Sequence, residues 1–495
     1  MLAACSDGSD AGSRSLGVPG ADNPGVVNVP AASLTGPLEG DPVLVSSFFS
    51  LASVDYEQQE FFVSGTANAY INRNELGSDG KWSVQAEREA DYRTRIVVIR
   101  PIDATQFNGT VVVEWLNVSA GFDSAPDWGM LHTEFIRRGY AWVGVSAQAA
   151  GVAALLDGSA AAIIPGTPFD DRYADLVHPG DAFSYDIYSQ VARLLRDSPL
   201  PLDGLSAQRY IAAGESQSAG RLMTYVNALA PIHALFDGYF IHSRTGGSAP
   251  LQGGLFDDVT VATPPIVTVR DDLATPVLML QTETDLFVLG SWPSNQPDTD
   301  NFRLWEIAGS AHADLYTFFD ARVDVGTNPA VAAVLENANP IPGIIECPVP
   351  VNAGPQHWVA KAAIAALNAW ISDGVAPPVA DRLAVTGSPA TFVLDDLGNV
   401  RGGIRTPYVD VPIAVLSGEG QPSSDFDPDN PNFCFLSGTT KLFDDSTLAS
   451  LYGDNAGYIE RLNAATEAAV AAGFLLPEDA ALIKAHAAGS TIFAP

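Results

Sequence analysis

The chain has 495 residues and a formal net charge of −33, from 58 acidic and 25 basic residues. Such an acidic surface repels nucleic acid, which we therefore exclude as a partner. Hydrophobic residues make up 47% of the chain and charged residues 17%, which indicates a large packed core rather than a disordered chain. No run of about 18 apolar residues occurs, so the sequence predicts no membrane span.

The first five residues read Met-Leu-Ala-Ala-Cys, and polar sequence rich in Gly, Pro and Ser follows. Leu-Ala-Ala-Cys is similar to a bacterial lipobox, in which the cysteine carries a lipid. We therefore expect an exported protein, periplasmic or extracellular, with a lipid anchor to the membrane at Cys5; a chance tetrapeptide is the alternative. Residues 1–45 are expected to form this lipoprotein-like N-terminus and a flexible arm.

From about residue 55, short apolar runs alternate with helical segments. Continuous apolar runs separated by helices predict an α/β fold with a mostly parallel, eight-stranded sheet covered on both faces. The expected strands are residues 60–70, 95–100, 110–116, 141–145, 209–213, 236–241, 276–281 and 302–307. The expected helices are residues 128–138, 185–195, 221–229 and 355–372.

Residues 46–375 are expected to form this α/β domain, with long irregular insertions at 147–180, 243–275 and 313–354. Residues 376–495 differ: they carry a Gly-Asn hairpin signal, a helical stretch at 448–472 and a shorter one after Pro477. We expect a C-terminal elaboration packed on the α/β domain; an independent second domain is the alternative.

The remaining cysteines are Cys347 and Cys434. An even pair in an exported protein predicts a disulfide between them, and two buried free thiols are the alternative. No Cys/His cluster has the spacing of a zinc site, and no glycine-rich loop has that of a phosphate site. We therefore expect neither a metal nor a cofactor.

The segment 214–220 reads Gly-Glu-Ser-Gln-Ser-Ala-Gly and joins an expected strand to an expected helix. Strand, sharp turn and helix are the context of a nucleophile elbow, which presents a serine hydroxyl at the end of a sheet. Ser216 is therefore the candidate nucleophile. The usual last glycine of the pattern is Ser218 here, and Ser218 itself is an alternative nucleophile. A turn without chemistry is the other interpretation.

A serine at neutral pH needs an adjacent base, and in this context the order along the chain is serine, acid, histidine. His312 follows the strand expected at 302–307 and is the candidate base. Asp285 and Glu283 both follow the preceding strand; we take Asp285 as the acid and keep Glu283 as the alternative. His242 also follows a strand, but it precedes the acid and therefore breaks the order.

An oxyanion formed at Ser216 needs two preorganised N–H donors. One should be the backbone N–H of Gln217, and the other should come from Asn117, Val118 or Ser119 in the loop after the third strand. Candidate pocket residues near strand ends, with plain core packing as the alternative for the tryptophans, are Trp115, Trp128, His242 and Trp292.

Together these segments resemble the bacterial alpha/beta hydrolase domain family of exported, largely uncharacterised serine hydrolases. The matching stretches are residues 93–101, 108–118, 139–151, 214–221, 309–312, 368–370 with Gly374 and Pro377-Pro378, and 402–412. The resemblance covers about residues 50–460 and implies an α/β-hydrolase fold, with Ser216 and His312 at catalytic positions. It does not define a substrate.

We therefore expect a serine esterase that cleaves a small-molecule carboxylic ester through an acyl-enzyme. Ser216 would be the nucleophile, His312 the base and Asp285 the acid. An acyltransferase, thioesterase or amidase would use the same three residues. From a different class, a catalytically silent binding lipoprotein of this fold is the alternative.

Overall fold

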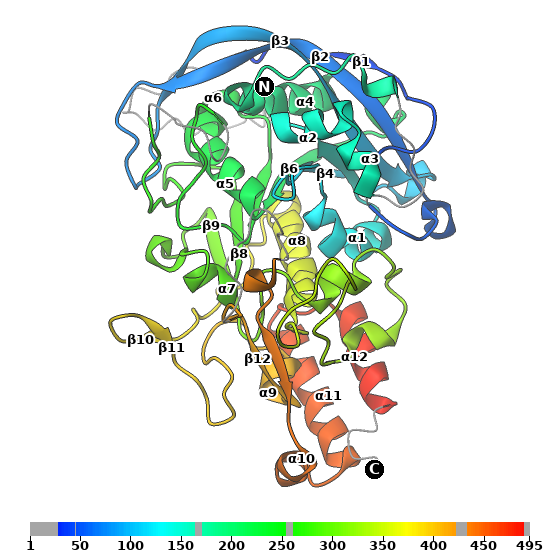
Figure 1. The fold of residues 1–495 in the computed structure, drawn as a ribbon, viewed down its shortest axis with the longest axis vertical. Helices are drawn as coiled ribbons and strands as arrows, with labels where there is room; N and C mark the ends of the chain where they lie inside the picture. The colour runs from blue at the N-terminus through cyan, green and yellow to red at the C-terminus, as the bar shows by residue number, and fades with distance from the viewer. Residues whose placement is uncertain (1–27, 45, 164–170, 254–260, 422–432, 490–495) are drawn as a thin grey trace, which may run out of the picture.

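The computed structural model describes residues 28–44, 46–163, 171–253, 261–421 and 433–489. Cys5, the expected lipidation site, lies outside the described residues, as does most of the expected arm. The described part contains one large sheet, helices on both faces of it, and a C-terminal group of helices and short strands (Figure 1).

Nine strands form the large sheet: β1 (Ser33–Thr35), β2 (Tyr56–Asn72), β3 (Val84–Pro101), β4 (Thr110–Trp115), β5 (Ala141–Val145), β6 (Arg209–Glu215), β7 (Gly238–His242), β8 (Val277–Thr282) and β9 (Phe302–Ile307). Their order across the sheet is β1-β2-β3-β5-β4-β6-β7-β8-β9. Strands β4 to β9 are parallel to one another, whereas β1, β2 and β3 join by antiparallel pairing. The expected mostly parallel sheet is therefore confirmed.

The number of strands and the length of two of them differ from the prediction. The sheet has nine strands and not eight, because Ser33–Thr35, from the expected arm, pairs with β2. The segments expected at 60–70 and 95–100 are only parts of β2 and β3, which pair over 17 and 18 residues (Figure 1). Residues 85–89 of β3 are exposed, so they carry no apolar pattern that could indicate a strand.

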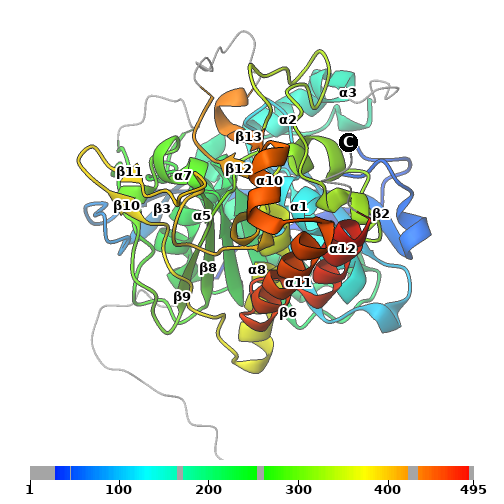
Figure 2. The same ribbon diagram turned by 90° about the horizontal axis from the view of Figure 1, so that it is seen from below.

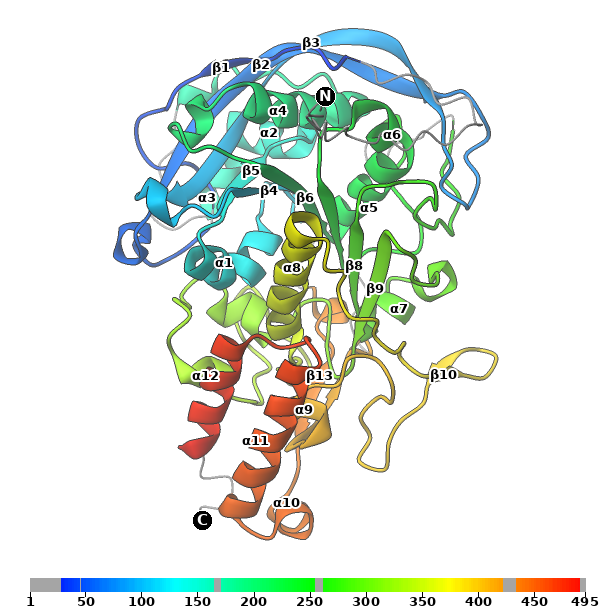
Figure 3. The same cartoon turned by 180° about the vertical axis from the view of Figure 1, so that it is seen from behind.

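Both faces of the sheet are buried, because alternate side chains of each central strand enter different cores. In β4, Val111 and Val113 pack in one core and Val112 packs in the other. Helices α4 (Ser184–Asp197), α5 (Gln217–Thr224) and α6 (Ala230–His233) contribute to the first core. Helices α1 (Pro126–Arg138) and α8 (Gln356–Asp373) contribute to the second and lie side by side across the sheet (Figure 3).

The remaining α-helices are α2 (Ala149–Leu156), α3 (Ser159–Ile163), α7 (Glu283–Phe287), α9 (Pro407–Asp410), α10 (Asp445–Tyr452), α11 (Asn455–Ala471) and α12 (Pro477–Ala488). The helix expected at 448–472 is thus divided into α10 and α11. The division occurs because Gly453 adopts a φ of 78° and Asp454 caps α11, accepting the N–H of Gly457 at 2.9 Å.

Buried charged side chains join α12 to helices α1 and α8. Asp479 of α12 accepts hydrogen bonds from Arg137 of α1 at 2.6 Å and from Lys361 of α8 at 3.1 Å. Figure 2, which views the molecule from below, shows α11 and α12 side by side in front of the sheet. Two further antiparallel strand pairs lie outside the large sheet. One pair is β12 (Ala414–Ser417) with β13 (Thr439–Leu442), and the other is β10 (Val385–Thr386) with β11 (Thr391–Phe392). A disulfide joins Cys347, in the insertion at 313–354, to Cys434.

Candidate active site

The candidate nucleophile, acid and base lie at the same edge of the sheet. Ser216 directly follows β6, Asp285 lies in α7 after β8, and His312 follows β9. Because β6 to β9 are parallel neighbours, their carboxyl ends meet at one edge, where polar groups from distant parts of the chain come together.

Ser216 has the strained backbone that a sharp strand-to-helix turn requires. Its φ is 58° and its ψ is −118°, a conformation that costs energy for any residue with a side chain. The turn is held because the N–H of Ser216 donates to the carbonyl oxygen of His242 at 2.9 Å. A Cβ on Gly214 would lie 2.9 Å from the carbonyl oxygen of Ser218, so only glycine fits there.

Ser218, the alternative nucleophile, is buried and hydrogen-bonded beside the turn, so its hydroxyl is not exposed. Its side chain is fully buried and its hydroxyl donates to the carbonyl oxygen of Leu116 at 3.2 Å. The serine at the last position of the motif therefore fixes the loop after β4 against α5. A glycine could not make this bond.

A continuous line of hydrogen bonds joins the three candidate residues. The hydroxyl of Ser216 lies 2.9 Å from Nε2 of His312, and Nδ1 of His312 lies 2.7 Å from Oδ1 of Asp285. Since a carboxylate only accepts, Nδ1 carries a proton and donates it to Asp285. The second oxygen of Asp285 accepts the backbone N–H of Thr282 at 2.6 Å, which fixes its orientation.

Glu283, the alternative acid, faces other partners. Its carboxylate accepts the backbone N–H groups of Gly309 at 2.6 Å and Gly418 at 2.8 Å, and the ring of His312 is not among its contacts. Burial raises the pKa of Glu283 to about 8. Of the two carboxylates after β8, Asp285 is the one that contacts His312.

Glu215 also contacts His312, and the sequence analysis did not identify it. Its Oε1 lies 3.2 Å from Nε2 of His312, and its Oε2 lies 3.4 Å from Nδ2 of Asn117. Burial raises the pKa of Glu215 to about 7. Burial by itself would lower the pKa of His312, but the carboxylates of Glu215 and Asp285 raise it above its ordinary value. The available signal was a carboxylate directly before the candidate nucleophile.

Fewer of the expected oxyanion donors have a free backbone N–H in the structure. The backbone N–H of Asn117 already donates to Ser124 at 2.9 Å, and that of Ser119 donates to the side chain of Asn117 at 2.7 Å. The backbone N–H groups of Asn117 and Ser119 already have acceptors, so neither is free to be the second oxyanion donor. Among the residues that the structure describes, Val118 keeps a backbone N–H without a hydrogen-bond partner. Gln217 begins α5, where the first N–H groups have no partner within the helix.

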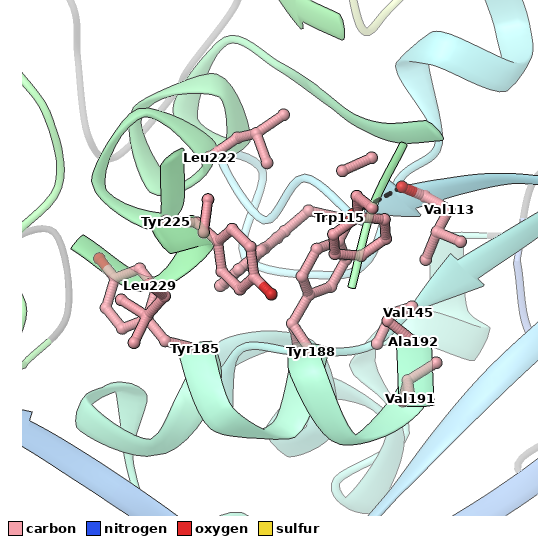
Figure 4. Close-up of a cluster of buried hydrophobic side chains, with 14 of the residues drawn as sticks. Val113, Trp115, Val145, Tyr185, Tyr188, Val191, Ala192, Leu222, Tyr225 and Leu229 are labelled. Carbon is pink, nitrogen blue, oxygen red and sulfur yellow. Dashed lines mark hydrogen bonds between the residues drawn. The ribbon is translucent and has the colours of Figure 1, made fainter. Parts of the chain in front are cut away.

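Two of the expected pocket residues belong to the cores instead. Trp115 is fully buried, with its ring centroid 4.7 Å from that of Tyr188 and 5.6 Å from that of Tyr185 (Figure 4). Trp128 is fully buried on the other face and donates its indole N–H to the carbonyl oxygen of Ser46 at 3.0 Å. A position near a strand end in the sequence did not show which face of the sheet each tryptophan would enter.

The other two pocket candidates have different positions. Trp292 is 39% exposed and lies beside Phe287, after α7. His242 is fully buried beneath the turn at Ser216, and its Nδ1 lies 2.8 Å from Oδ1 of Asp127. This carboxylate raises the pKa of His242, although burial alone would lower it. His242 therefore supports the turn and is not an open pocket wall.

Within the described ranges, no group of three or more His, Cys, Asp or Glu side chains is arranged to hold a metal ion. In the same part of the chain, none of the helices combines the length and the apolar character needed to cross a membrane.

Several solved structures are similar to parts of this chain. An esterase from Pseudomonas putida is 11% identical over 48% of this chain and 67% of its own, with a TM-score of 0.24. A glucuronoyl esterase from Solibacter usitatus is 9% identical over 51% and 76%, with a TM-score of 0.27. Acetyl xylan esterase 1 from a Thermoanaerobacterium species is 11% identical over 56% and 81%, with a TM-score of 0.29.

No curated protein matches the chain in sequence. The sequence model of one family, described as alpha/beta hydrolase domain, matches residues 24–485, which is most of the chain. The match spans the sheet, the edge that carries Ser216 and the C-terminal helices up to α12. The chain therefore belongs to the alpha/beta hydrolase domain family.

Proposed function

We propose that this protein is a serine esterase that hydrolyses a small-molecule carboxylic ester through an acyl-enzyme. One observation carries the proposal: the hydrogen-bonded line from the hydroxyl of Ser216 through the imidazole of His312 to the carboxylate of Asp285. The hydrogen bond to Asp285 keeps a proton on Nδ1, which leaves Nε2 as the nitrogen that can accept the proton of Ser216.

In the first half of the reaction, Oγ of Ser216 attacks the acyl carbon while its proton moves to Nε2 of His312. That proton then passes to the alcohol oxygen as its bond to the acyl carbon breaks. In the second half, a water molecule gives a proton to Nε2 as its oxygen attacks the acyl carbon. Nε2 then passes this proton to Oγ as the bond between Oγ and the acyl carbon breaks, which releases the acid and restores the hydroxyl of Ser216. Asp285 stabilises the imidazolium that forms in both halves.

The developing oxyanion needs N–H donors that are already in place. The backbone N–H of Gln217 at the start of α5 is one candidate, and the unpartnered N–H of Val118 is the other. The N-terminal end of α5 adds the positive end of a helix dipole beside Ser216. Removing one such donor in other enzymes costs about 10²–10³-fold in kcat.

The proposal also includes export to an oxidising compartment. The Cys347–Cys434 disulfide supports it, because disulfides persist outside the reducing cytosol. The lipid anchor at Cys5 stays part of this proposal. Amide, thioester and acyl-transfer chemistry would need the same groups, so the acceptor and the bond cleaved have to be measured.

The decisive experiment is labelling with a fluorophosphonate probe together with turnover of p-nitrophenyl esters of increasing chain length. We expect Ser216→Ala to abolish both labelling and turnover. Ser372→Ala is the matched control, because Ser372 is exposed on α8 and its hydroxyl donates to the carboxylate of its neighbour Asp373. Full ester turnover by Ser216→Ala would overturn the proposal. Product analysis with competing alcohols separates hydrolysis from acyl transfer.

A further inference from the structure

Glu215 brings a second carboxylate to the imidazole of His312, on the side of the nucleophile. Its Oε1 lies 3.2 Å from Nε2, the ring nitrogen that also lies 2.9 Å from the hydroxyl of Ser216. The Glu215 side chain is 10% exposed, so bulk water hardly weakens this contact. The nitrogen that has to accept the proton of Ser216 therefore has two neighbours that compete for it.

This contact requires a proton. Nδ1 already donates to Asp285, so in neutral His312 the Nε2 atom carries only a lone pair. A lone pair and a carboxylate oxygen would repel each other at 3.2 Å. One proton, held either by Glu215 or by Nε2, removes this repulsion, and on Nε2 it makes the contact an ion pair between the imidazolium and the carboxylate. While that proton is present on Nε2, His312 cannot accept another from Ser216.

The groups around this pair do not remove the need for the shared proton. Asp285 faces Nδ1, and His242 with its carboxylate partner Asp127 lies beneath the turn. The charges of His312 and His242 favour ionised Glu215, whereas Asp127 and Asp285 disfavour it, and burial outweighs them all and raises its pKa to about 7. Burial therefore favours the protonated form of Glu215, while its carboxylate favours the protonated form of His312.

Other nearby charged groups face partners of their own. Glu283 accepts the N–H groups of two glycines, and Glu114 accepts the N–H groups at the start of α1 at 3.0 and 2.8 Å. Arg221 of α5 pairs with Asp181 at 2.8 Å. None of these contacts reaches Nε2 of His312, so Glu215 is the carboxylate on that side of the ring in the described structure.

We propose that Glu215 is a catalytic residue that shares the Nε2 proton of His312, so that the two groups act as one base. This proposal rests on the proposed function. When the shared proton leaves to solvent, Glu215 is a carboxylate and His312 is neutral. The O–H bond of Ser216 then breaks towards Nε2 as Oγ bonds to the acyl carbon. The new N–H lies between Glu215 and the leaving oxygen, and its proton passes to that oxygen as the ester bond breaks.

Two consequences follow for the rate. The shared proton has to leave before Nε2 can act, so it sets the lower pH limit of activity. Once it has left, the Glu215 carboxylate stabilises the imidazolium formed during attack, in addition to the stabilisation by Asp285. Glu215 therefore makes His312 a stronger base at the expense of activity at low pH.

The first test compares the pH profiles of kcat/KM for the wild type and Glu215→Gln, which keeps size and polarity. We expect the acidic limb to move to lower pH by about one unit, because an ionised neighbour raises a histidine pKa by that order. We expect the rate on the alkaline plateau to fall by about 3- to 10-fold, because the imidazolium loses one partner. Glu215→Asp, with a shorter carboxylate, should lie between the two.

Glu134→Gln is the matched control. Glu134 is also buried and burial also raises its pKa to about 7, but it pairs with Arg137 and Arg138 in α1. Its acidic limb should coincide with that of the wild type. An unshifted limb in Glu215→Gln, or an equal shift in Glu134→Gln, would overturn the role of Glu215.

The second test does not depend on turnover. The ring nitrogens of His312 are titrated by ¹⁵N NMR in Ser216→Ala and in Ser216→Ala/Glu215→Gln, with His312→Gln used to assign the signals. We expect the pKa of His312 to be lower by about one unit in the double variant. Equal pKa values would refute the shared proton and leave the proposed function intact. Full ester turnover by Ser216→Ala would instead refute the proposed function.

Discussion

The carboxylate of Glu283 accepts the backbone N–H of Gly418 at 2.8 Å, across 135 positions of the chain. Its other oxygen accepts the N–H of Gly309, three residues before His312. The hydroxyl of Thr284 donates to the carbonyl oxygen of Gly418 at 2.7 Å and accepts the N–H of His312 at 3.2 Å. The C-terminal part of the chain therefore helps to hold the loop that carries the candidate base.

Glu283→Ala should destabilise the protein and weaken catalysis together. It leaves two buried N–H groups without a partner, which costs about 2–4 kcal/mol in the free energy of unfolding. The loop at Gly309 also loses its main contact with α7, so kcat should fall. Urea unfolding and steady-state kinetics measure the two effects. An unchanged urea midpoint would contradict the role of this carboxylate in joining the two segments.

The pH dependence of stability should report the same group. Burial raises the pKa of Glu283 from an ordinary 4.5 to about 8 in the folded protein. Between these two values the folded state keeps a proton that the unfolded chain releases, so the free energy of unfolding falls as pH rises. The contribution is complete below the unfolded pKa and is lost as pH passes through the folded one.

Glu283→Gln cannot release this proton. We therefore expect its free energy of unfolding to decline less than that of the wild type between pH 4.5 and about 8. Urea titrations at several pH values measure the difference between the two slopes. Parallel curves for the two proteins would mean that Glu283 ionises normally in the folded state.

The choice between the two carboxylates after β8 is tested by Asp285→Asn against Glu283→Gln. An asparagine can donate its amide N–H to Nδ1, which moves the imidazole proton to Nε2 and blocks the acceptance of the Ser216 proton. The kcat of Asp285→Asn should fall by about 10³–10⁴-fold. Glu283→Gln should retain far more activity. A larger loss in Glu283→Gln would reverse the assignment of the acid.

The central strands could be predicted because burial on both faces leaves a signal in the sequence. Val111, Val112 and Val113 are all apolar since they face two different cores. The first half of β3 could not be predicted, because residues 85–89 are exposed and are held by pairing with β2. Backbone pairing of this kind depends on a partner strand and leaves no pattern in the side chains.

The positions of the three candidate catalytic residues could be predicted, because they depend on the order of the parallel strands. Ser216, Asp285 and His312 come together because each follows a parallel strand of the same sheet. Glu215 was missed because its contact with His312 depends on the rotation of the chain within the turn, which a motif does not specify. Trp128 was misplaced for a similar reason, since a position near a strand end does not say which face the side chain enters.

The Cys347–Cys434 disulfide should stabilise the segment beside the base. It closes a loop of 87 positions, and the N–H of Ala313, next to His312, donates to the carbonyl oxygen of Leu436, near Cys434. Replacing both cysteines by serine should lower the free energy of unfolding by about 2–5 kcal/mol. The wild type in dithiothreitol should behave like the double variant. Equal stability of the oxidised and reduced proteins would exclude this role.

The turn at Ser216 offers a matched pair of glycines. A Cβ at Gly214 would meet the carbonyl oxygen of Ser218 at 2.9 Å, whereas a Cβ at Gly220 would meet its nearest neighbour, the N of Ala249, at 3.7 Å. Gly214→Ala must therefore open the turn and move Ser216 away from His312, so fluorophosphonate labelling should slow by at least about tenfold. Gly220→Ala lies within α5 and should raise helix stability by up to about 1 kcal/mol.

Thermal melts and labelling rates of the two variants provide the comparison. Wild-type labelling by Gly214→Ala would show that the turn tolerates a side chain there, and the strained geometry of Ser216 would then not depend on glycine. A loss of labelling in Gly220→Ala alone would point instead to the packing of α5. The contrast between the two variants isolates the turn itself, because both changes add the same single methyl group within six residues of each other.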